Sequence, residues 1–272
     1  MDEEPVTEVD KNTEPKTTTQ TSPKKHGHKK LYIVLVTILI ILLVPVLFAG
    51  WLGFVPGLSD LMGASKAKDL GVHYTAADLA SYQQKTGVIF NDFAAAPPNP
   101  NKPGKFIVFA NPKTVDGISV SQVELTAAIN EADWLWMPLT NTQVRLTGGV
   151  VEVSGNLNID YISNFISFIG GVGYSQQDVD KAVGLAKKFV GSAPVYIKAT
   201  ASVNNNDVSL NLSEAKVGRY NVPLGIANNV LTNGTQNAIT NTAGLNATSA
   251  QPTNGALVFT GTYPTTVYVK KN

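Results

Sequence analysis

The chain has 272 residues, with 21 Lys and Arg against 20 Asp and Glu, a formal net charge of +1 and no cysteine. This length is sufficient for one sizeable domain with additional segments. The balanced charge excludes the basic surface that nucleic-acid binding requires, and the lack of cysteine excludes disulfides and thiol chemistry.

Residues 1–30 contain almost no large apolar side chains: the segment is acidic first, then rich in Thr, Ser and Pro, then basic. Such a composition buries too little apolar surface to offset the entropy cost of ordering. The sequence therefore predicts a disordered tail over residues 1–30.

Residues 31–54, "LYIVLVTILIILLVPVLFAGWLGF", carry no charge. As a helix this stretch would be about 36 Å long, against a hydrocarbon core of about 30 Å. Pro45 is tolerated in a membrane helix, and Trp51 and Phe54 are placed as interfacial anchors. The alternative, a cleaved signal peptide, is disfavoured because the apolar run is long and no suitable cleavage site follows. We expect a single transmembrane helix.

Basic residues before the apolar segment predict its orientation. Only Lys66 and Lys68 follow the segment closely, so the positive-inside rule places the N-terminus in the cytoplasm and the C-terminal domain outside the cell membrane. The preceding basic flank, which we expect to touch anionic lipid, consists of Lys24, Lys25, Lys29 and Lys30. His26 and His28 lie within it, but a solvated basic flank is a simpler interpretation than a metal site.

Residues 55–104 are predicted to form an extracytoplasmic stalk. "TAAD" (75–78) has the spacing of a helix capping box, and "AAAPPNPNKPG" (94–104) reads as a proline-rich linker. The main domain is therefore expected over residues 105–272. Two more capping boxes, "SQVE" (121–124) and "SQQD" (175–178), predict helices within it.

The stretch "TQVRLTGGVVEVSGNLNI" (142–159) alternates apolar and polar residues around Gly148 and Gly149. Two glycines suit a two-residue hairpin turn, because both positions need positive φ. That register places Arg145 opposite Glu152 on the polar face. We interpret the pair as an exposed cross-strand contact that contributes less than about 1 kcal/mol, not as a catalytic pair.

Residues 195–203 and 208–212 predict a second hairpin around "NNND" (204–207), and residues 257–269 predict a last strand in which Pro264 indicates an edge or a bulge. Each strand is apolar on one face only. An antiparallel sheet of this kind must cover its apolar face with helices. Helices after Ser175 and near 223–240 are candidates, and the predicted fold class is α+β.

Two aromatic stretches are the candidate binding residues. "YISNFISFIGG" (161–171) is nearly uncharged and has apolar residues at helical spacing, and "DWLWMP" (133–138) holds two tryptophans. A buried core helix is one interpretation, and a surface that meets lipid is the other. The candidate lipid-binding residues are Trp134, Trp136, Ile162, Phe165, Phe168 and Ile169.

Catalytic patterns are scarce. In the region that follows the predicted membrane segment His73 is the only histidine, so a His-based triad and a multi-histidine zinc site are excluded there. "GGVG" (170–173) lacks the lysine and the spacing of a phosphate loop. We expect no enzyme activity, no cofactor and no metal.

The order of elements resembles the membrane-anchored bacterial domains of the YpmS and LmeA kind. The similarity covers roughly residues 115–270 and rests on "VELTAAIN", "GGVVEVSG" and "VGRYNVPLG". It implies a TULIP-like fold, in which a strongly curved antiparallel sheet wraps a helix around an apolar lipid groove. The departures are the long stalk and the insert at 161–174.

Two functional hypotheses follow. The first is a membrane-tethered, non-catalytic extracytoplasmic module that binds lipid or another amphiphile in an apolar groove. The second is a cell-surface structural or interaction domain with a closed core and a protein or envelope-polymer partner.

Overall fold

The computed structural model describes residues 28–55, 57–98, 107–132, 134–188 and 192–271, with only the backbone for 28–35. Residues 1–27 of the predicted tail, with Lys24 and Lys25, and the domain start at 105 lie outside the described residues, whereas residues 28–30, predicted to be disordered, belong to a helix. Of Lys29 and Lys30 only the helical backbone is described. The chain divides into two compact units, Met1–Leu43 and Val44–Asn272.

Helix α1 spans His28–Leu52 and contains Pro45. Among the residues described here, no helix combines the length and the apolarity needed to cross a membrane. The transmembrane segment predicted for 31–54 begins in the part of α1 for which only the backbone is described.

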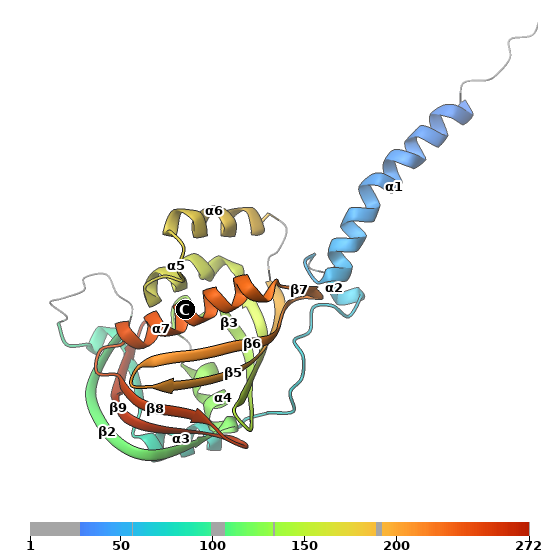
Figure 1. Ribbon diagram of the computed structural model, residues 1–272. Coiled ribbons are helices and arrows are strands. Elements are labelled where there is room, and N and C mark those ends of the chain that lie inside the picture. The colour runs from blue at the N-terminus through green and yellow to red at the C-terminus, as the bar shows by residue number, and fades with distance from the viewer. Residues whose placement is uncertain (1–27, 56, 99–106, 133, 189–191, 272) are drawn as a thin grey trace, which may run out of the picture. The chain divides into compact units, whose positions relative to one another are not determined.

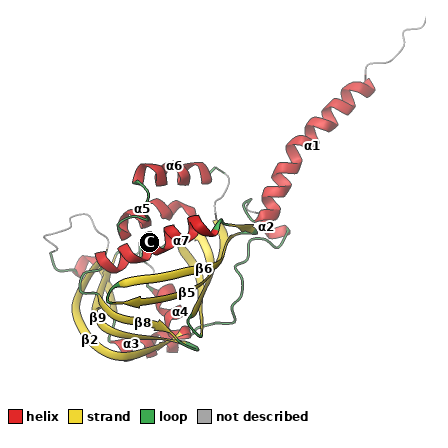
Figure 2. Cartoon of the chain, viewed as in Figure 1, coloured by secondary structure: helices red, strands yellow, loops and turns green. Residues whose placement is uncertain are grey.

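The second unit is built on one large sheet that packs on helices (Figures 1 and 2). Its strands are β1 (Ile89–Asp92), β2 (Ile107–Ser121), β3 (Leu139–Thr147), β4 (Val150–Asn158), β5 (Ser192–Asn204), β6 (Asp207–Val217), β7 (Tyr220–Asn221), β8 (Asn246–Pro252) and β9 (Ala256–Val269). Its helices after α1 are α2 (Leu58–Leu61), α3 (Ala76–Thr86), the 3-10 turn η1 (Phe93–Ala95), α4 (Gln122–Glu131), α5 (Ile159–Ile169), α6 (Gln176–Ala186) and α7 (Leu224–Asn241). The α+β class is confirmed.

The sheet is mixed, so the prediction of a purely antiparallel sheet is wrong. The strand order is β1-β9-β8-β5-β4-β3, with β2 on β9, β6 on β5 and β7 on β6. The exception to antiparallel pairing is β1, which runs parallel to β9 from Ile89 opposite Thr266 to Asp92 opposite Val269. Strand β1 comes from the segment before the proline-rich stretch, and it pairs with β9 along the edge that β2 leaves free.

The hairpin of β3 and β4 has the predicted register. Gly148 and Gly149 have φ of 52° and 84° and form the turn, and Val144 lies opposite Val153. The three predicted capping boxes also open helices: Thr75 precedes α3, Ser121 precedes α4 and Ser175 precedes α6. Local sequence chemistry therefore sets these boundaries.

Helix α4 covers the free edge of β3 with three polar side chains. The side-chain oxygens of Gln122, Thr126 and Asn130 accept hydrogen bonds from the backbone N–H groups of Leu146 (3.0 Å), Val144 (3.1 Å) and Thr142 (2.9 Å), respectively. Four helical residues rise about 6 Å and two strand residues about 6.6 Å, so the two periods match. The helix takes the place of a neighbouring strand and satisfies an edge that would otherwise pair with other chains.

Helix α7 lies on the sheet through apolar side chains, and α5 and α6 pack on each other and on α7. Ala227 of α7 packs with Ala199, Leu212 and Ala215 of β5 and β6, and Figure 1 shows α7 crossing β6. A second buried group joins α5 to α6 and the loop between them. It comprises Ile159, Ile169, Val172, Val179 and Val183.

We expect Thr126→Val to destabilise the fold by about 1–3 kcal/mol, because the buried N–H of Val144 loses its acceptor while the side-chain volume is kept. Thr114→Val is the matched control, since the Thr114 hydroxyl is exposed and bonds only to Thr262. Urea denaturation of the detergent-solubilised full chain, followed by tryptophan fluorescence, measures both. Equal midpoints for the two variants would refute the role of α4 at the sheet edge.

Candidate functional site

The predicted lipid-binding residues come together in part. The Trp134 ring lies 5.8 Å from that of Phe165 and 5.2 Å from that of Phe168, the second contact edge-to-face. Ile162, Phe165 and Phe168 pack from α5 against the buried group that contains Ile169. We call Trp134, Phe165 and Phe168 the aromatic cluster.

The six predicted residues are divided between core and surface. Ile169 is 8% exposed and belongs to the core, whereas Trp134, Trp136, Ile162, Phe165 and Phe168 are half-buried. Trp136 has a left-handed backbone, with φ of 69°. Each of these five side chains therefore presents part of its apolar surface to solvent.

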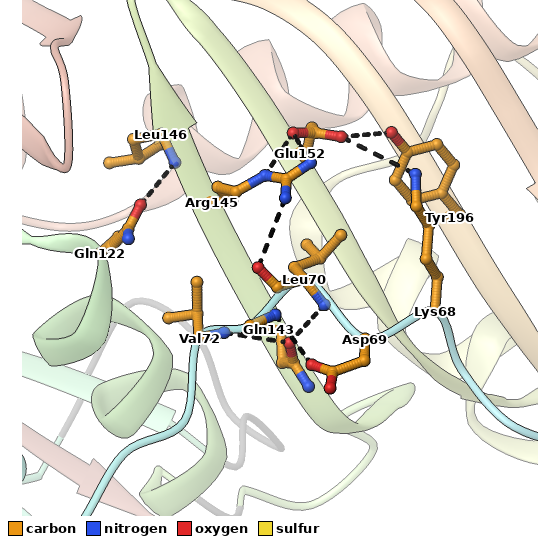
Figure 3. Close-up of polar contacts among 11 residues, drawn as sticks. Lys68, Asp69, Leu70, Val72, Gln122, Gln143, Arg145, Leu146, Glu152 and Tyr196 are labelled. Carbon is orange, nitrogen blue, oxygen red and sulfur yellow. Dashed lines mark hydrogen bonds and ion pairs between the residues drawn. The ribbon is translucent and has the colours of Figure 1, made fainter.

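The Arg145–Glu152 pair does not lie on an exposed face, so that prediction is wrong. The two residues are opposite one another as predicted, but Glu152 is only 6% exposed. Residues 66–72, from the segment predicted as a stalk, run across this face and cover it (Figure 3). The hairpin pattern shows which face is polar, but not whether a distant segment covers that face.

Glu152 receives donors from three parts of the chain. The Arg145 Nε donates to Oε2 at 2.6 Å, and the Tyr196 hydroxyl donates to Oε1 from β5. The Lys68 ammonium lies 3.9 Å from Oε1 and 3.7 Å from the centre of the Tyr196 ring. The carboxylate thus joins β3, β4, β5 and the covering segment (Figure 3).

Gln143 and Arg145 hold the covering segment by its backbone. The Gln143 Oε1 accepts from the N–H groups of Leu70 (2.7 Å) and Val72 (3.4 Å), and Arg145 donates to the Leu70 carbonyl at 3.5 Å. Leu70 and Val72 are buried beside Tyr196. Residues 66–72 are therefore part of the folded domain and not a free stalk.

The pKa of Glu152 is below its ordinary value. Burial alone would raise it, but the hydrogen bonds from Tyr196 and Arg145 outweigh burial. Burial and the bond to Glu152 raise the pKa of Tyr196. At neutral pH the site therefore holds a charged, fully paired carboxylate and a neutral phenol, which is a structural arrangement and not that of a general acid or base.

A second buried carboxylate, Glu124, joins α4 to α3. It is 4% exposed, and it accepts from Lys85 and Ser81, each at 2.7 Å, and from the Ser121 backbone N–H at 2.7 Å. Burial raises its pKa, but these hydrogen bonds prevail and lower the pKa to about 2. Like Glu152, this carboxylate is held by hydrogen bonds and an ion pair within the fold.

A basic pocket lies beside the Glu152 cluster, between residues 63–68 and strands β5 and β6. It has a volume of about 240 Å³. Its charged and aromatic lining consists of Lys66, Lys68, Tyr196, Glu214, Lys216 and Arg219. Four of these side chains are cationic and one is anionic, so the lining has a positive surplus. We call this site the basic pocket.

Sequence reasoning did not find the basic pocket. The sequence places Lys66 and Lys68 only in the flank of the predicted membrane segment, and Lys216 and Arg219 lie about 150 residues further along the chain. No local spacing links the two pairs. The turn "VGRY" (217–220) is a local signal for part of the site. Its glycine suits positive φ and allows another backbone segment to approach closely, beside the basic residue Arg219.

Metal ligands do not gather in the described part of the chain, where no group of three or more His, Cys, Asp or Glu side chains could hold an ion. His73 lies 3.5 Å from Asp69 on the surface. The expectation that the protein has no metal and no cofactor stays a prediction.

The fold and the two sites define the class as an α+β protein with a large mixed sheet packed on helices. Comparison with protein-family models, with curated proteins and with solved structures returned no match. The resemblance to YpmS- and LmeA-like domains therefore stays a prediction.

We expect Glu152→Gln to destabilise the fold by about 2–3 kcal/mol, because hydrogen bonds to a buried charge are strong and Arg145 loses its counter-ion. Glu214→Gln is the control, since the ion pair of Glu214 with Lys216 is over a third exposed on both sides and contributes less than about 1 kcal/mol. Denaturant midpoints measure both. A loss below 1 kcal/mol in the first variant would restore the exposed-pair interpretation.

Acid should weaken the fold through Glu124. Its pKa is about 2 in the folded state against an ordinary 4.5, so its contribution to stability is complete above 4.5 and is lost as the pH falls towards 2. Glu152 acts in the same direction. Thermal unfolding measured across this range should show a falling Tm, with a shallower fall in Glu124→Gln. Parallel curves for the parent and the variant would contradict this assignment.

Proposed function

We propose that this chain is a membrane-tethered, non-catalytic extracytoplasmic module that binds a lipid or another amphiphile. The observation that carries amphiphile binding is the half-buried aromatic cluster of Trp134, Phe165 and Phe168, which lies over an apolar core. In water a contiguous aromatic surface of this kind favours an apolar partner.

The tether is supported by the apolar side chains of α1. From Ile38 to Trp51 the large apolar residues of this helix are exposed, Leu42 to 65% and Trp51 to 47%. Exposed apolar side chains around a helix gain free energy when lipid covers them. The charge-free sequence 31–54 and the lysines that precede it support a single-pass helix with its N-terminus in the cytoplasm.

A TULIP-like arrangement is the finer architecture that we propose for the second unit. It is supported by the long paired strands β2 and β9, which curve around the domain in Figure 1, and by α7 lying on β5 and β6. In such an arrangement an acyl chain would bind through apolar area, at about 0.8 kcal/mol per buried CH₂.

The absence of catalysis is supported by the state of the two buried carboxylates. Glu124 and Glu152 are paired with cations and hydroxyl groups, and both have lowered pKa values. Neither is available to transfer a proton near neutral pH, because each is already ionised and its oxygens are occupied.

The alternative function, a cell-surface interaction domain with a closed core, is favoured by the cluster beneath the aromatics. Ile159, Val172 and Val183 are each 5–8% exposed and fill the space between α5, α6 and the loop that joins them. A core this complete would support a binding face for a protein or an envelope polymer instead of a lipid chain.

Replacing Phe165 and Phe168 with Ser tests amphiphile binding. We expect the double variant of the full chain to take up a fluorescent phospholipid at least fivefold more weakly, because it loses most of the aromatic surface beside Trp134. Since both rings are half-buried, the stability cost should be about 2–4 kcal/mol, below the sum for two fully buried rings.

Tyr174→Ser with Leu185→Ser is the matched control, since these apolar side chains are 51% and 61% exposed and lie outside the aromatic cluster. The control should bind the probe as the parent does. A parent chain that binds no probe, together with a large fall in the denaturation midpoint of the double Phe variant, would reject lipid binding and favour the interaction domain.

A further inference from the structure

The basic pocket has more cationic side chains than its neighbouring acidic residues pair with. Glu214 forms an ion pair with Lys216, and Glu152 is held chiefly by Arg145 and Tyr196. Lys66 is exposed and has no acidic partner among the residues described, and the Lys68 side chain is half-exposed. Two ammonium groups and the Arg219 guanidinium therefore remain to attract an anion.

The structure of the pocket holds these cations around a common space. Lys68 is fixed between the Glu152 carboxylate and the Tyr196 ring, and Arg219 donates to the Met62 carbonyl at 3.0 Å. With Lys66 and Lys216 they converge from two sides on about 240 Å³, enough for a phosphate group with part of its substituent. Convergent Arg and Lys side chains bind phosphate through charge-assisted hydrogen bonds.

Arg219, in the wall of the basic pocket, contacts the C-terminal end of α1. The Arg219 N–H donates to the Leu52 carbonyl at 2.8 Å, and its guanidinium lies 5.2 Å from the centre of the Trp51 ring. Gly218 makes this approach possible, because a Cβ there would lie 1.9 Å from the Leu52 oxygen. If α1 leaves the bilayer at Trp51, as the proposed tether requires, the basic pocket lies at the level of the lipid headgroups.

Exposed apolar side chains border the same end of the domain. Leu61 precedes Met62, to which Arg219 bonds, and it is 83% exposed; Tyr220 follows Arg219 and is 50% exposed. Leu224 and Ile226 follow in the first turn of α7 and are exposed as well. Cations among protruding apolar residues suit a membrane interface, where apolar side chains enter the acyl boundary and cations meet phosphate.

We propose that the basic pocket binds the phosphate of an anionic phospholipid headgroup on the extracytoplasmic surface of the membrane that anchors the chain. This inference rests on the proposed tether, but it concerns a site separate from the aromatic cluster. A lipid is favoured over a soluble phosphate compound because Gly218 and Arg219 of the pocket wall contact the end of α1 and exposed apolar side chains lie beside them. Binding positions the domain on the membrane surface.

Calorimetric titration of the full chain in zwitterionic detergent micelles tests the site. Short-chain phosphatidylglycerol should bind, more weakly as salt is raised, and phosphatidylcholine should bind at least tenfold more weakly because its charge is balanced. Lys66→Gln with Arg219→Gln should lower the affinity for phosphatidylglycerol at least tenfold. Lys113→Gln with Lys181→Gln, which removes two exposed cations elsewhere, should change it less than twofold.

Because Arg219 also contacts Met62 and Trp51, the single variant Lys66→Glu provides a second measurement, on a side chain for which the described part of the chain shows no hydrogen bond or ion pair. It should weaken phosphatidylglycerol binding at least fivefold while the denaturation midpoint stays that of the parent. Equal binding of both lipids, or unchanged affinity in Lys66→Glu, would overturn the proposal. Glycerol phosphate or inorganic phosphate binding as tightly as the lipid would overturn the lipid source.

Two parallel measurements separate failure of this site from failure of the proposed function. Membrane fractionation of cells that express the parent reports the tether: a chain recovered in the soluble fraction would reject the proposed function. A chain that stays in the membrane but shows no preference for phosphatidylglycerol would reject the basic pocket alone. The Phe165→Ser, Phe168→Ser variant should keep the preference for phosphatidylglycerol over phosphatidylcholine even though its total lipid uptake falls, since those residues do not line the pocket.

Discussion

The buried carboxylate of Glu152 is the interaction on which this structure depends. A charge that is 6% exposed must be neutralised and hydrogen-bonded, and its partners come from β3, β5 and residues 66–72. Meeting that requirement fixes Tyr196 and Lys68, which also line the basic pocket. The same carboxylate therefore stabilises the sheet, docks the covering segment and shapes the proposed anion site.

Several polar contacts of the domain are of one kind: a side-chain oxygen accepts a hydrogen bond from a backbone N–H group that the strand pairing of the sheet does not use. Gln122, Thr126 and Asn130 do so along the edge of β3, and Gln143 does so for residues 70–72. Both devices act on β3, the last strand in the sheet order. An edge strand protected in this way resists pairing with other chains.

The proposed functional surfaces differ in chemistry and in their elements. The aromatic cluster joins α5 to the segment before β3, whereas the basic pocket joins residues 63–68 to β5, β6 and the turn after β6. An amphiphile has both an apolar and a charged part, and in the proposed function each kind of surface would contact one of them. Separate variants in Phe165 and Lys66 address them independently.

The sequence by itself determined what depends on neighbouring residues. The Gly148-Gly149 turn, the register of Arg145 with Glu152 and the capping boxes of α3, α4 and α6 follow from local φ preferences and hydrogen bonds. Tertiary structure decided the parallel strand β1, the burial of Glu152 beneath residues 66–72 and the meeting of Lys66 with Arg219. Each of these joins segments that lie far apart along the chain, as Ile89 and Thr266 do in the pair of β1 and β9. A face's polarity follows from alternation along a strand, but its burial depends on which distant segment packs on it.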